Sequence, residues 1–268
     1  MNAETRPSVL VTGGARRIGS AIARAFGRAG WHVVVHYGTS EAEAQALAAS
    51  LPSAQAISCD LADSDRAVGM IEDLARRLDD WRVLVNCASI FPLDTADALQ
   101  SATFLSVMGV NAAAPARMAQ AFLAHARSGQ PRRAIQVTDQ KVANPNPDFF
   151  SYTMSKHALS STVAMLSMSR RDLRDRVYGL APGAILASHD QDEREAERSH
   201  RLNLLQRRTG ADEVAQAALF LAGGWLSSGE TLFVDSGQHL LRQPRDVLFL
   251  ARESPSGPNE SLRKNPDS

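Results

Sequence analysis

The chain has 268 residues, of which 44% are hydrophobic and 22% are charged. This composition is ordinary for a globular protein with a sizeable core, and it excludes a chain that is disordered as a whole. The 29 basic and 29 acidic residues cancel to a formal net charge of zero, so no overall field draws the protein to nucleic acid or to an anionic membrane, and a small molecule is the expected partner.

Two features of the sequence bear on where the protein works. Residues 1–7 lack the basic flank and the long apolar stretch of a signal peptide, and no uncharged apolar run is long enough to cross a bilayer. Cys59 and Cys87 do not have the spacing of a zinc site. We interpret them instead as buried free thiols in a reducing compartment. We therefore expect a cytoplasmic protein with no disulfide and no membrane attachment.

Seven short runs rich in β-branched and aliphatic residues alternate with segments of helical periodicity. The expected strands are 9–11, 33–35, 56–58, 83–85, 134–137, 177–180 and 231–234. Strands of this kind, separated by helices, are typical of a parallel sheet that is covered on both faces. The expected fold class is therefore α/β, a Rossmann-type doubly wound sheet of seven parallel strands with helices on both faces. Residues 1–253 are expected to form a single domain, and the polar residues 254–268 a disordered tail.

A glycine-rich turn, residues 12–19, separates the first strand from the first helix, which is expected to end at Gly30. Such a turn lets the backbone approach a pyrophosphate, which the N–H groups and the dipole of the helix N-terminus favour. Arg16 and Arg17 can add bidentate contacts to phosphate. The turn alone also fits ordinary strand-to-helix geometry, and the two arginines also fit a solvated basic pair.

The end of the second strand bears on the choice of dinucleotide. His36, Tyr37 and Ser40 stand where an Asp or Glu would accept a hydrogen bond from a ribose 2′-hydroxyl. An imidazole and a hydroxyl group are instead available to a 2′-phosphate. The sequence therefore predicts NADP(H) rather than NAD(H).

Tyr152 and Lys156 are separated by four positions, which places them on one face of a helix. A nearby ammonium group is expected to lower the pKa of the tyrosine toward working pH, as a general acid requires. By itself the pair also fits a chance combination on a helix surface.

Five motifs together resemble the short-chain dehydrogenase/reductase family: the glycine turn, residues 86–89 after the fourth strand, Asn111, the Tyr152 and Lys156 pair, and residues 182–183. The resemblance implies that Tyr152 is the proton donor, that Lys156 binds a ribose and activates the tyrosine, and that Asn111 anchors a water relay. It also implies a homotetramer or a homodimer. The expected NADP(H) contacts are Gly13, Arg16, Arg17, Ile18, Gly19, His36, Tyr37, Ser40, Asp60 near the adenine, Leu61, Asn86, Ala88, Ser89, Lys156, Pro182, Gly183 and Ser188.

Two departures from the common family pattern narrow the resemblance. Arg17 stands at the middle glycine of the turn, and Asp139, thirteen residues before the tyrosine, stands where the family has a serine. Both changes are similar to pteridine reductases and dihydromonapterin reductases. The segment that ends at Phe91 resembles the one whose aromatic ring stacks on the pterin, although core packing is the ordinary role of such a residue. Thr39 departs from this subgroup, because an arginine there often binds the 2′-phosphate; Arg16 and Ser40 would take over that contact.

Asp139 suits the reduction of a ring C=N bond, which needs a hydride at carbon and a proton at nitrogen. An aspartate in a water-poor site can keep its proton and share its delivery with Tyr152, whereas a serine suits a ketone oxygen. The alternative is a carboxylate that only caps a helix or a loop. The expected substrate contacts are Arg17, Ser89, Phe91, Asp139 and Tyr152, and the expected catalytic residues are Asn111, Asp139, Tyr152 and Lys156.

Two loops that follow strand ends, residues 144–150 and 188–201, are expected to gate the substrate. The second holds an acidic run between His189 and His200, which has no diagnostic ligand spacing, so no metal is expected. The leading hypothesis is an NADPH-dependent reductase of a dihydropterin-like substrate. The alternatives are an NADPH-dependent carbonyl reductase of ketones or quinones and, in another class, a catalytically silent NADP(H)-binding regulatory protein.

Overall fold

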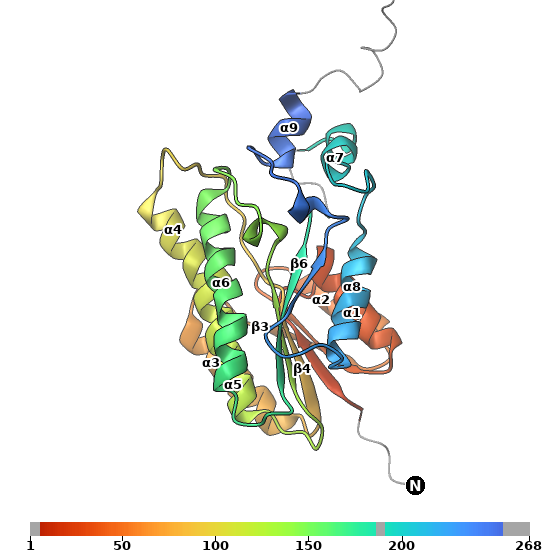
Figure 1. Cartoon of the computed structure of the whole chain (residues 1–268). Coiled ribbons are helices and arrows are strands. Elements are labelled where there is room, and N and C mark those ends of the chain that lie inside the picture. The colour runs from red at the N-terminus through yellow and green to blue at the C-terminus, as the bar shows by residue number, and fades with distance from the viewer. Residues whose placement is uncertain (1–5, 186–190, 254–268) are drawn as a thin grey trace, which may run out of the picture.

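The computed structural model describes residues 6–185 and 191–253. Within them, seven strands form one sheet in the order β3-β2-β1-β4-β5-β6-β7, and every neighbouring pair is parallel (Figure 1). The strands are β1 (Ser8–Val11), β2 (His32–Tyr37), β3 (Ala54–Ser58), β4 (Trp81–Asn86), β5 (Arg133–Val137), β6 (Arg176–Pro182) and β7 (Thr231–Val234). Each covers one of the runs predicted from the sequence, and the expected fold class is confirmed. The tail predicted over 254–268 lies outside the described residues.

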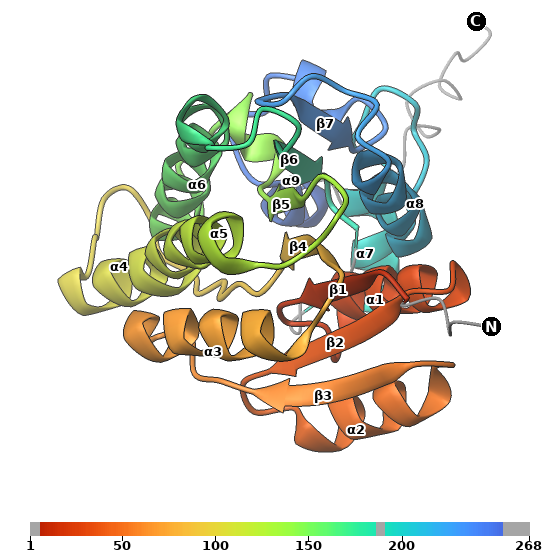
Figure 2. The same cartoon turned by 90° about the horizontal axis from the view of Figure 1, so that it is seen from below.

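Helices cover both faces of the sheet (Figure 2). One face carries α1 (Arg17–Arg28), α2 (Glu41–Ser50) and α8 (Ala211–Ala222), and the other carries α3 (Ser64–Arg77), α5 (Ala114–His125) and α6 (Phe150–Ser169). The helix α4 (Ser101–Met108) packs against α6 and continues into α5 through a π-helical turn, η1 (Gly109–Ala113). As expected, α1 ends just before Gly30, which has a φ of 85°. No helix in the described part of the chain has the length and apolar character that a membrane span requires.

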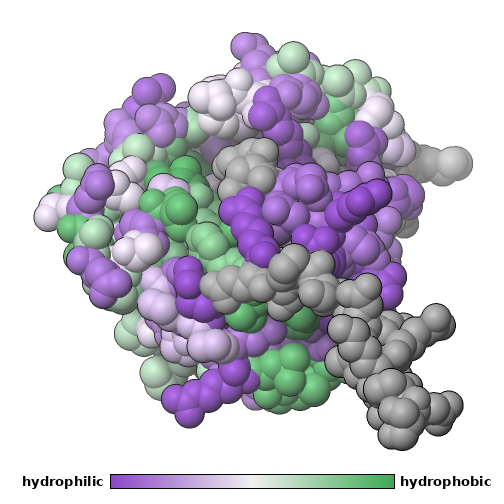
Figure 3. Space-filling view, turned by 90° about the horizontal axis from the view of Figure 1, so that it is seen from above, coloured by the Kyte–Doolittle hydropathy of each residue, from purple (hydrophilic) through white to green (hydrophobic). Residues whose placement is uncertain are grey.

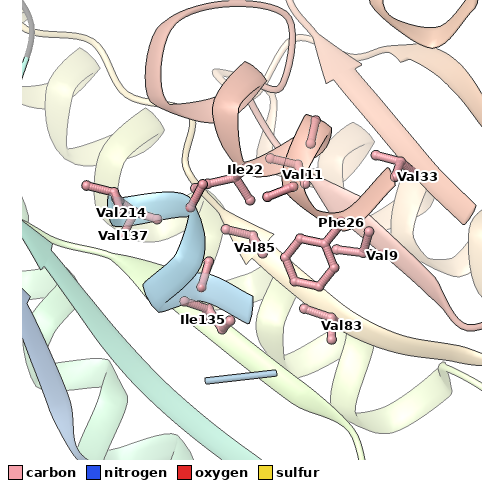
Figure 4. Packing of buried hydrophobic residues seen from close by; sticks show 14 of the residues in the cluster. Val9, Val11, Ile22, Phe26, Val33, Val83, Val85, Ile135, Val137 and Val214 are labelled. Carbon is pink, nitrogen blue, oxygen red and sulfur yellow. The ribbon is translucent and has the colours of Figure 1, made fainter. Parts of the chain in front are cut away.

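The alternation of side chains along the strands divides the core into two layers. Val9 and Val11 of β1 point to the first layer, where they pack with Ile22 and Phe26 of α1 (Figure 4). Leu10 points to the second layer, which α3, α5 and α6 cover. Strands that are covered on both faces need apolar residues at every position, which explains why the runs in the sequence lack polar alternation.

The carboxyl ends of the strands lie at the top of Figure 1, together with α7 (Glu193–His200), α9 (Val247–Glu253) and the short helices η2 (Gln140–Val142) and η3 (Gln238–Leu240). The chain leaves β1 toward β2 on one side and later returns to β4 on the other, so the order of the strands reverses between β1 and β4. Ligands of open α/β sheets bind at such a reversal point. Viewed from this end, hydrophobic surface lies beside strongly hydrophilic surface (Figure 3).

Candidate active site

The glycine turn lies at the reversal point, between β1 and α1. Gly13 has a φ of 62°, and a Cβ atom there would lie 2.9 Å from the Cα atom of Ala88. A Cβ atom at Gly19 would lie 2.1 Å from the carbonyl oxygen of Gly13. The hydroxyl of Thr12 accepts hydrogen bonds from the N–H groups of Cys87 (2.9 Å) and Ala88 (3.1 Å), which fixes the turn against the end of β4. The glycines are therefore required by close packing, and the N-terminus of α1 faces this edge of the sheet.

Arg17 has a backbone conformation that favours glycine. Its φ is 52°, in the left-handed region, where a residue with a Cβ atom is strained by about 1–2 kcal/mol. Its side chain is exposed at the carboxyl edge of the sheet. The other arginine of the turn, Arg16, is also exposed and forms an ion pair with Glu43 of α2.

His36 does not have the role that the sequence predicts. Its Nδ1 accepts a hydrogen bond from the N–H of Gly13 (3.1 Å), so its Nε2 carries the proton and donates to the carbonyl oxygen of Cys59 (3.0 Å). Burial lowers the pKa of the ring to about 4. His36 is thus a neutral, buried support of the glycine turn, and its imidazole offers neither a charge nor a donor to a 2′-phosphate. Tyr37 is also buried, which leaves Arg16 and the half-buried Ser40 for that contact.

The predicted reacting groups come together where β5 ends beside α6. The hydroxyl of Tyr152 donates to Oδ2 of Asp139 over 2.7 Å. The other carboxylate oxygen of Asp139 accepts from the N–H of Lys141 over 2.8 Å, so the carboxyl also caps η2. Lys156, one turn further along α6, donates through Nζ to the carbonyl oxygen of Val137 (2.9 Å) and lies 5.5 Å from the centre of the Tyr152 ring. Tyr152 and Lys156 therefore share a site, and the chance surface pair is excluded.

The protonation of this group differs from the expectation. Burial first, and the charge of Asp139 second, raise the pKa of Tyr152 well above its ordinary value. Burial likewise lowers the pKa of Lys156 and raises the pKa of Asp139. The expected lowering of the tyrosine pKa by Lys156 is thus wrong for the protein without a bound cofactor. In this state Tyr152 keeps its proton, and burial favours a protonated Asp139 beside it.

Asn111 lies in the π-helical turn η1, fully buried. Its amide group donates to the carbonyl oxygen of Ile90 (2.9 Å) and to the hydroxyl of Ser155 (3.1 Å), and its oxygen accepts from the N–H of Ile90 (2.9 Å). Asn111 therefore fixes the segment after β4 to α6. π-Helical turns are often found at functional sites, and this one places the amide between the two segments. Its function as anchor of a water relay stays a prediction.

Phe91 belongs to an aromatic cluster at the site. Its ring stacks on that of Phe149, with the ring centres 4.0 Å apart. It is nearly perpendicular to the ring of Tyr152, with the ring centres 4.4 Å apart. Phe91 is 37% exposed, so it is not part of the core. The sequence did not single out Phe149, which has a φ of 53° and directly precedes α6 in the loop 144–150. The only available signal was that this loop precedes the helix of Tyr152.

Other predicted contacts lie at the same edge of the sheet. Asn86, at the end of β4, donates to the carbonyl oxygen of Pro115 and to Gln136, whereas its own buried oxygen has no partner among the described residues. Pro182 ends β6, and a Cβ atom at Gly183 would lie 2.7 Å from Asp235. The remaining residues at this edge are Ile18, Leu61, Ser89 and Asp60, whose carboxylate accepts from the N–H of Ala62. Ser188 and His189 lie outside the described residues.

Metal ligands do not gather anywhere in the described ranges: no group of three His, Cys, Asp or Glu side chains is close enough to hold an ion. The acidic run ends in α7, whose residue Glu197 pairs with Arg201 and Arg208. Both cysteines are free thiols; Cys59 is buried and Cys87 is partly exposed. Burial raises the pKa of the Cys87 thiol to about 11, so it is protonated at neutral pH.

Comparison with known proteins agrees with this geometry. The family model described as enoyl-(acyl carrier protein) reductase matches residues 13–239. The pteridine reductase 1 of Leishmania tarentolae is 30% identical, over 89% of this chain and 98% of its own length. A dihydromonapterin reductase of Escherichia coli is 24% identical, over 88% of this chain and 99% of its own length.

Several solved structures with the same fold were determined with NADP. The FolM alternative dihydrofolate reductase 1 of Brucella canis, complexed with NADP, has a TM-score of 0.83 and 32% identity, and the match covers 90% of this chain and 97% of that one. The angucycline C-6 ketoreductase LanV, with bound NADP, has a TM-score of 0.78 and 27% identity, over 88% of this chain and 96% of that one.

Proposed function

We propose that this chain, which belongs to the short-chain dehydrogenase/reductase family, reduces a dihydropterin-like heterocycle. It is an NADP(H)-dependent oxidoreductase, like its solved neighbours that were determined with NADP. The single observation that carries the proposal is the hydrogen bond of 2.7 Å between the Tyr152 hydroxyl and the Asp139 carboxyl. Two of the relatives are pterin reductases by name, and their identities of 30% and 24% extend over nearly the whole chain.

The residues at the reversal point fit a dinucleotide. The glycine turn packs closely at Gly13 and Gly19, and it places the backbone N–H groups of the α1 N-terminus at this edge, where they favour a pyrophosphate. The buried ammonium of Lys156 has one hydrogen bond within the described residues, so two of its donors remain for ribose hydroxyls. Arg16 and Ser40 would hold the 2′-phosphate. When bound, NADPH supplies the hydride.

The second half of the reaction needs a proton at a ring nitrogen, and this is the task of Asp139 and Tyr152. Burial raises the pKa of Asp139, which favours its neutral form, and it raises the pKa of Tyr152, which keeps the proton on the hydroxyl. A protonated carboxyl beside the tyrosine can replace the proton that the hydroxyl gives up. A serine at position 139 would orient the tyrosine hydroxyl but would hold no proton for a ring nitrogen.

The aromatic cluster supports a flat substrate. The exposed ring of Phe91 lies against Tyr152, so a planar heterocycle that stacks on Phe91 would bring its edge close to the proton donor. Phe149 supports the back of Phe91 and limits its movement. Arg17 and Ser89, both exposed at this edge, would contact polar groups of the substrate.

The proposal is tested by the oxidation of NADPH in the presence of 7,8-dihydromonapterin, dihydrobiopterin, dihydrofolate and simple ketones. We expect turnover of at least one dihydropterin, a fall of about 100-fold or more in kcat for Tyr152→Phe, and loss of pterin turnover for Asp139→Ser. Turnover of ketones alone, retained in Asp139→Ser, would identify a carbonyl reductase instead. Tight NADPH binding without any turnover would identify a silent binding protein.

Association and location are part of the same proposal. Several large apolar side chains are more than half exposed, among them Met165 and Met168 on α6, Leu105 on α4 and Trp225 after α8. Apolar side chains of this size at an exposed surface favour a homotetramer or a homodimer. Multi-angle light scattering would measure the mass. The free thiols are consistent with the cytoplasm as the site of action.

A further inference from the structure

A cluster of charges, of which only Arg245 is substantially exposed, joins the loop after β5 to the chain just ahead of α9. Nζ of Lys141 lies 2.7 Å from Oδ2 of Asp246, and Nε of Arg245 lies 2.8 Å from Oδ2 of Asp148. The N–H of Asp246 also donates to Asp148 over 2.8 Å. Two adjacent residues of the C-terminal segment thus hold both ends of the loop that leads from Asp139 to Tyr152.

Lys141 is the centre of this cluster. Its ammonium group donates to Asp246, to Oδ1 of Asn146 (2.9 Å) and to the carbonyl oxygen of Asp148 (3.3 Å), which uses all three of its N–H groups. The side chain is 4% exposed. Lys141 therefore has no donor left for a substrate, and any effect on the reaction must pass through its neighbours.

The backbone of Lys141 provides that connection. Its N–H donates to Oδ1 of Asp139 (2.8 Å), and its carbonyl oxygen lies 3.1 Å from Nε2 of His157, the residue after Lys156 on α6. The same residue thus touches the proposed acid, the helix of the proposed proton donor and the C-terminal segment. A movement of its side chain would displace the N–H group that orients the Asp139 carboxyl.

We propose that Lys141 and Asp246 form a positioning pair that sets the orientation and the proton affinity of Asp139, so that the C-terminal segment 245–249 is a working part of the active site. The proposal rests on the proposed function in one respect, namely that Asp139 takes part in proton delivery. Neither member of the pair touches the reacting atoms.

The two charges of the pair act on the acid in opposite directions. The charged or titratable groups that face Asp139 are Lys141 on η2 and Tyr152 and Lys156 on α6, while Asp246 and Cys87 face Tyr152. Lys141 favours the ionised form of Asp139, and Asp246 opposes ionisation at the tyrosine. Loss of Asp246 removes the ion-pair partner of the Lys141 ammonium and leaves more positive charge beside the acid, and loss of Lys141 leaves the Asp246 carboxylate without its ion-pair partner.

The decisive measurement is the titration of Asp139 by carbon NMR in protein labelled with carbon-13 at the aspartate carboxyl groups, with Asp139→Asn to assign the signal. We expect the pKa of Asp139 to fall in Asp246→Asn, to rise in Lys141→Met and to return toward the wild-type value in the double variant. Lys141→Arg and Asp246→Glu keep both charges and are expected to titrate as wild type. A matched control is Asp175→Asn, which breaks another buried ion pair, with Arg132, at the opposite edge of the sheet.

The same variants separate a positioning function from a merely structural one. In Asp246→Asn the basic limb of the pH profile of pterin reduction is expected to move to lower pH by about one unit, so that kcat on that limb falls about tenfold while KM for NADPH is unchanged. Identical Asp139 titration in wild type and in both single variants, or shifts in the same direction in both, would overturn the proposal. The NMR titration needs no substrate, so it tests the positioning pair separately from the proposed function. If the protein reduces no pterin but the pKa of Asp139 still falls in Asp246→Asn and rises in Lys141→Met, the proposed function is refuted and the positioning pair is supported.

Discussion

A buried ion pair lies at the amino edge of the sheet and another at the carboxyl edge, and we assign the two pairs different functions. At the amino edge, Arg132 binds Asp175 through its backbone N–H and its guanidinium group, and joins the start of β5 to the start of β6. At the carboxyl edge, Lys141 binds Asp246 and touches the Asp139 carboxyl through its N–H. The first pair connects neighbouring strands. The second connects distant segments around Asp139, the proposed acid, so we expect the same kind of interaction to contribute stability at the amino edge and to orient a reacting group at the carboxyl edge.

The largest expected effect is the loss of the amino-edge pair. Asp175→Asn leaves the largely buried Arg132 without its charged partner. We expect the free energy of unfolding to fall by about 3 kcal/mol, because removal of one partner of a buried pair leaves the desolvation cost of the other uncompensated. Urea denaturation measures the change. The specific activity of the folded protein should equal that of wild type, and a loss of activity without a loss of stability would contradict the division between the two edges.

A smaller change in the free energy of unfolding, an increase instead of a decrease, is expected for a substitution at Asp139. Burial raises the pKa of this carboxyl in the folded protein, so the stability of wild type is greatest below the unfolded value of 3.8 and falls as the pH rises through the folded pKa. Asp139→Asn removes that loss while its oxygen still caps η2. We expect the variant to be more stable than wild type by about 1 kcal/mol at pH 7, with reduced pterin turnover.

The comparison of thermal denaturation at pH 7 and pH 4 tests the cause. The gain in stability should shrink toward pH 4, where wild type also carries the proton. A gain that is the same at both values would mean that ionisation of Asp139 is not its source. Asp175→Asn is the control here too, because it removes a carboxylate that lies far from the site.

The smallest effect concerns Arg17. Arg17→Gly relieves the strain of a left-handed φ, which favours the variant by about 1–2 kcal/mol. The greater backbone freedom of glycine in the unfolded chain offsets part of this gain. We expect the midpoint of thermal unfolding to change by only a few degrees and KM for the pterin to rise. Arg17→Lys keeps the strain and the charge; if it raised KM as much as the glycine variant, the planar guanidinium group would be the essential feature.

The fold was predictable because its signal is local. Each strand is a short apolar run between helical segments, and burial on both faces requires such runs at every strand of a parallel sheet. The positions of Tyr152, Lys156 and Asp139 followed from spacing and from the family resemblance. Those signals lie in single short segments, which is why they could be read without knowledge of the tertiary contacts.

What the sequence did not reveal depends on contacts between distant segments. Lys141 and Asp246 are each unremarkable in sequence, and only the fold brings them to 2.7 Å. His36 was expected to meet a phosphate, but the turn at Gly13 occupies its Nδ1. The predicted shift of the Tyr152 pKa had the wrong direction. Spacing indicates only that a lysine is near, whereas the shift is determined by burial and by the charge of Asp139, both of which depend on the tertiary structure.

The separation of the core into two layers has a consequence for spectroscopy. Trp31 packs edge-on against Phe26 in the layer of α1, and Trp81 packs against Phe122 in the layer of α5. The third tryptophan, Trp225, is 78% exposed. Each half of the interior therefore contains its own intrinsic fluorophore, and the sheet stands between them, so the emission of this chain carries separate information about its two sides.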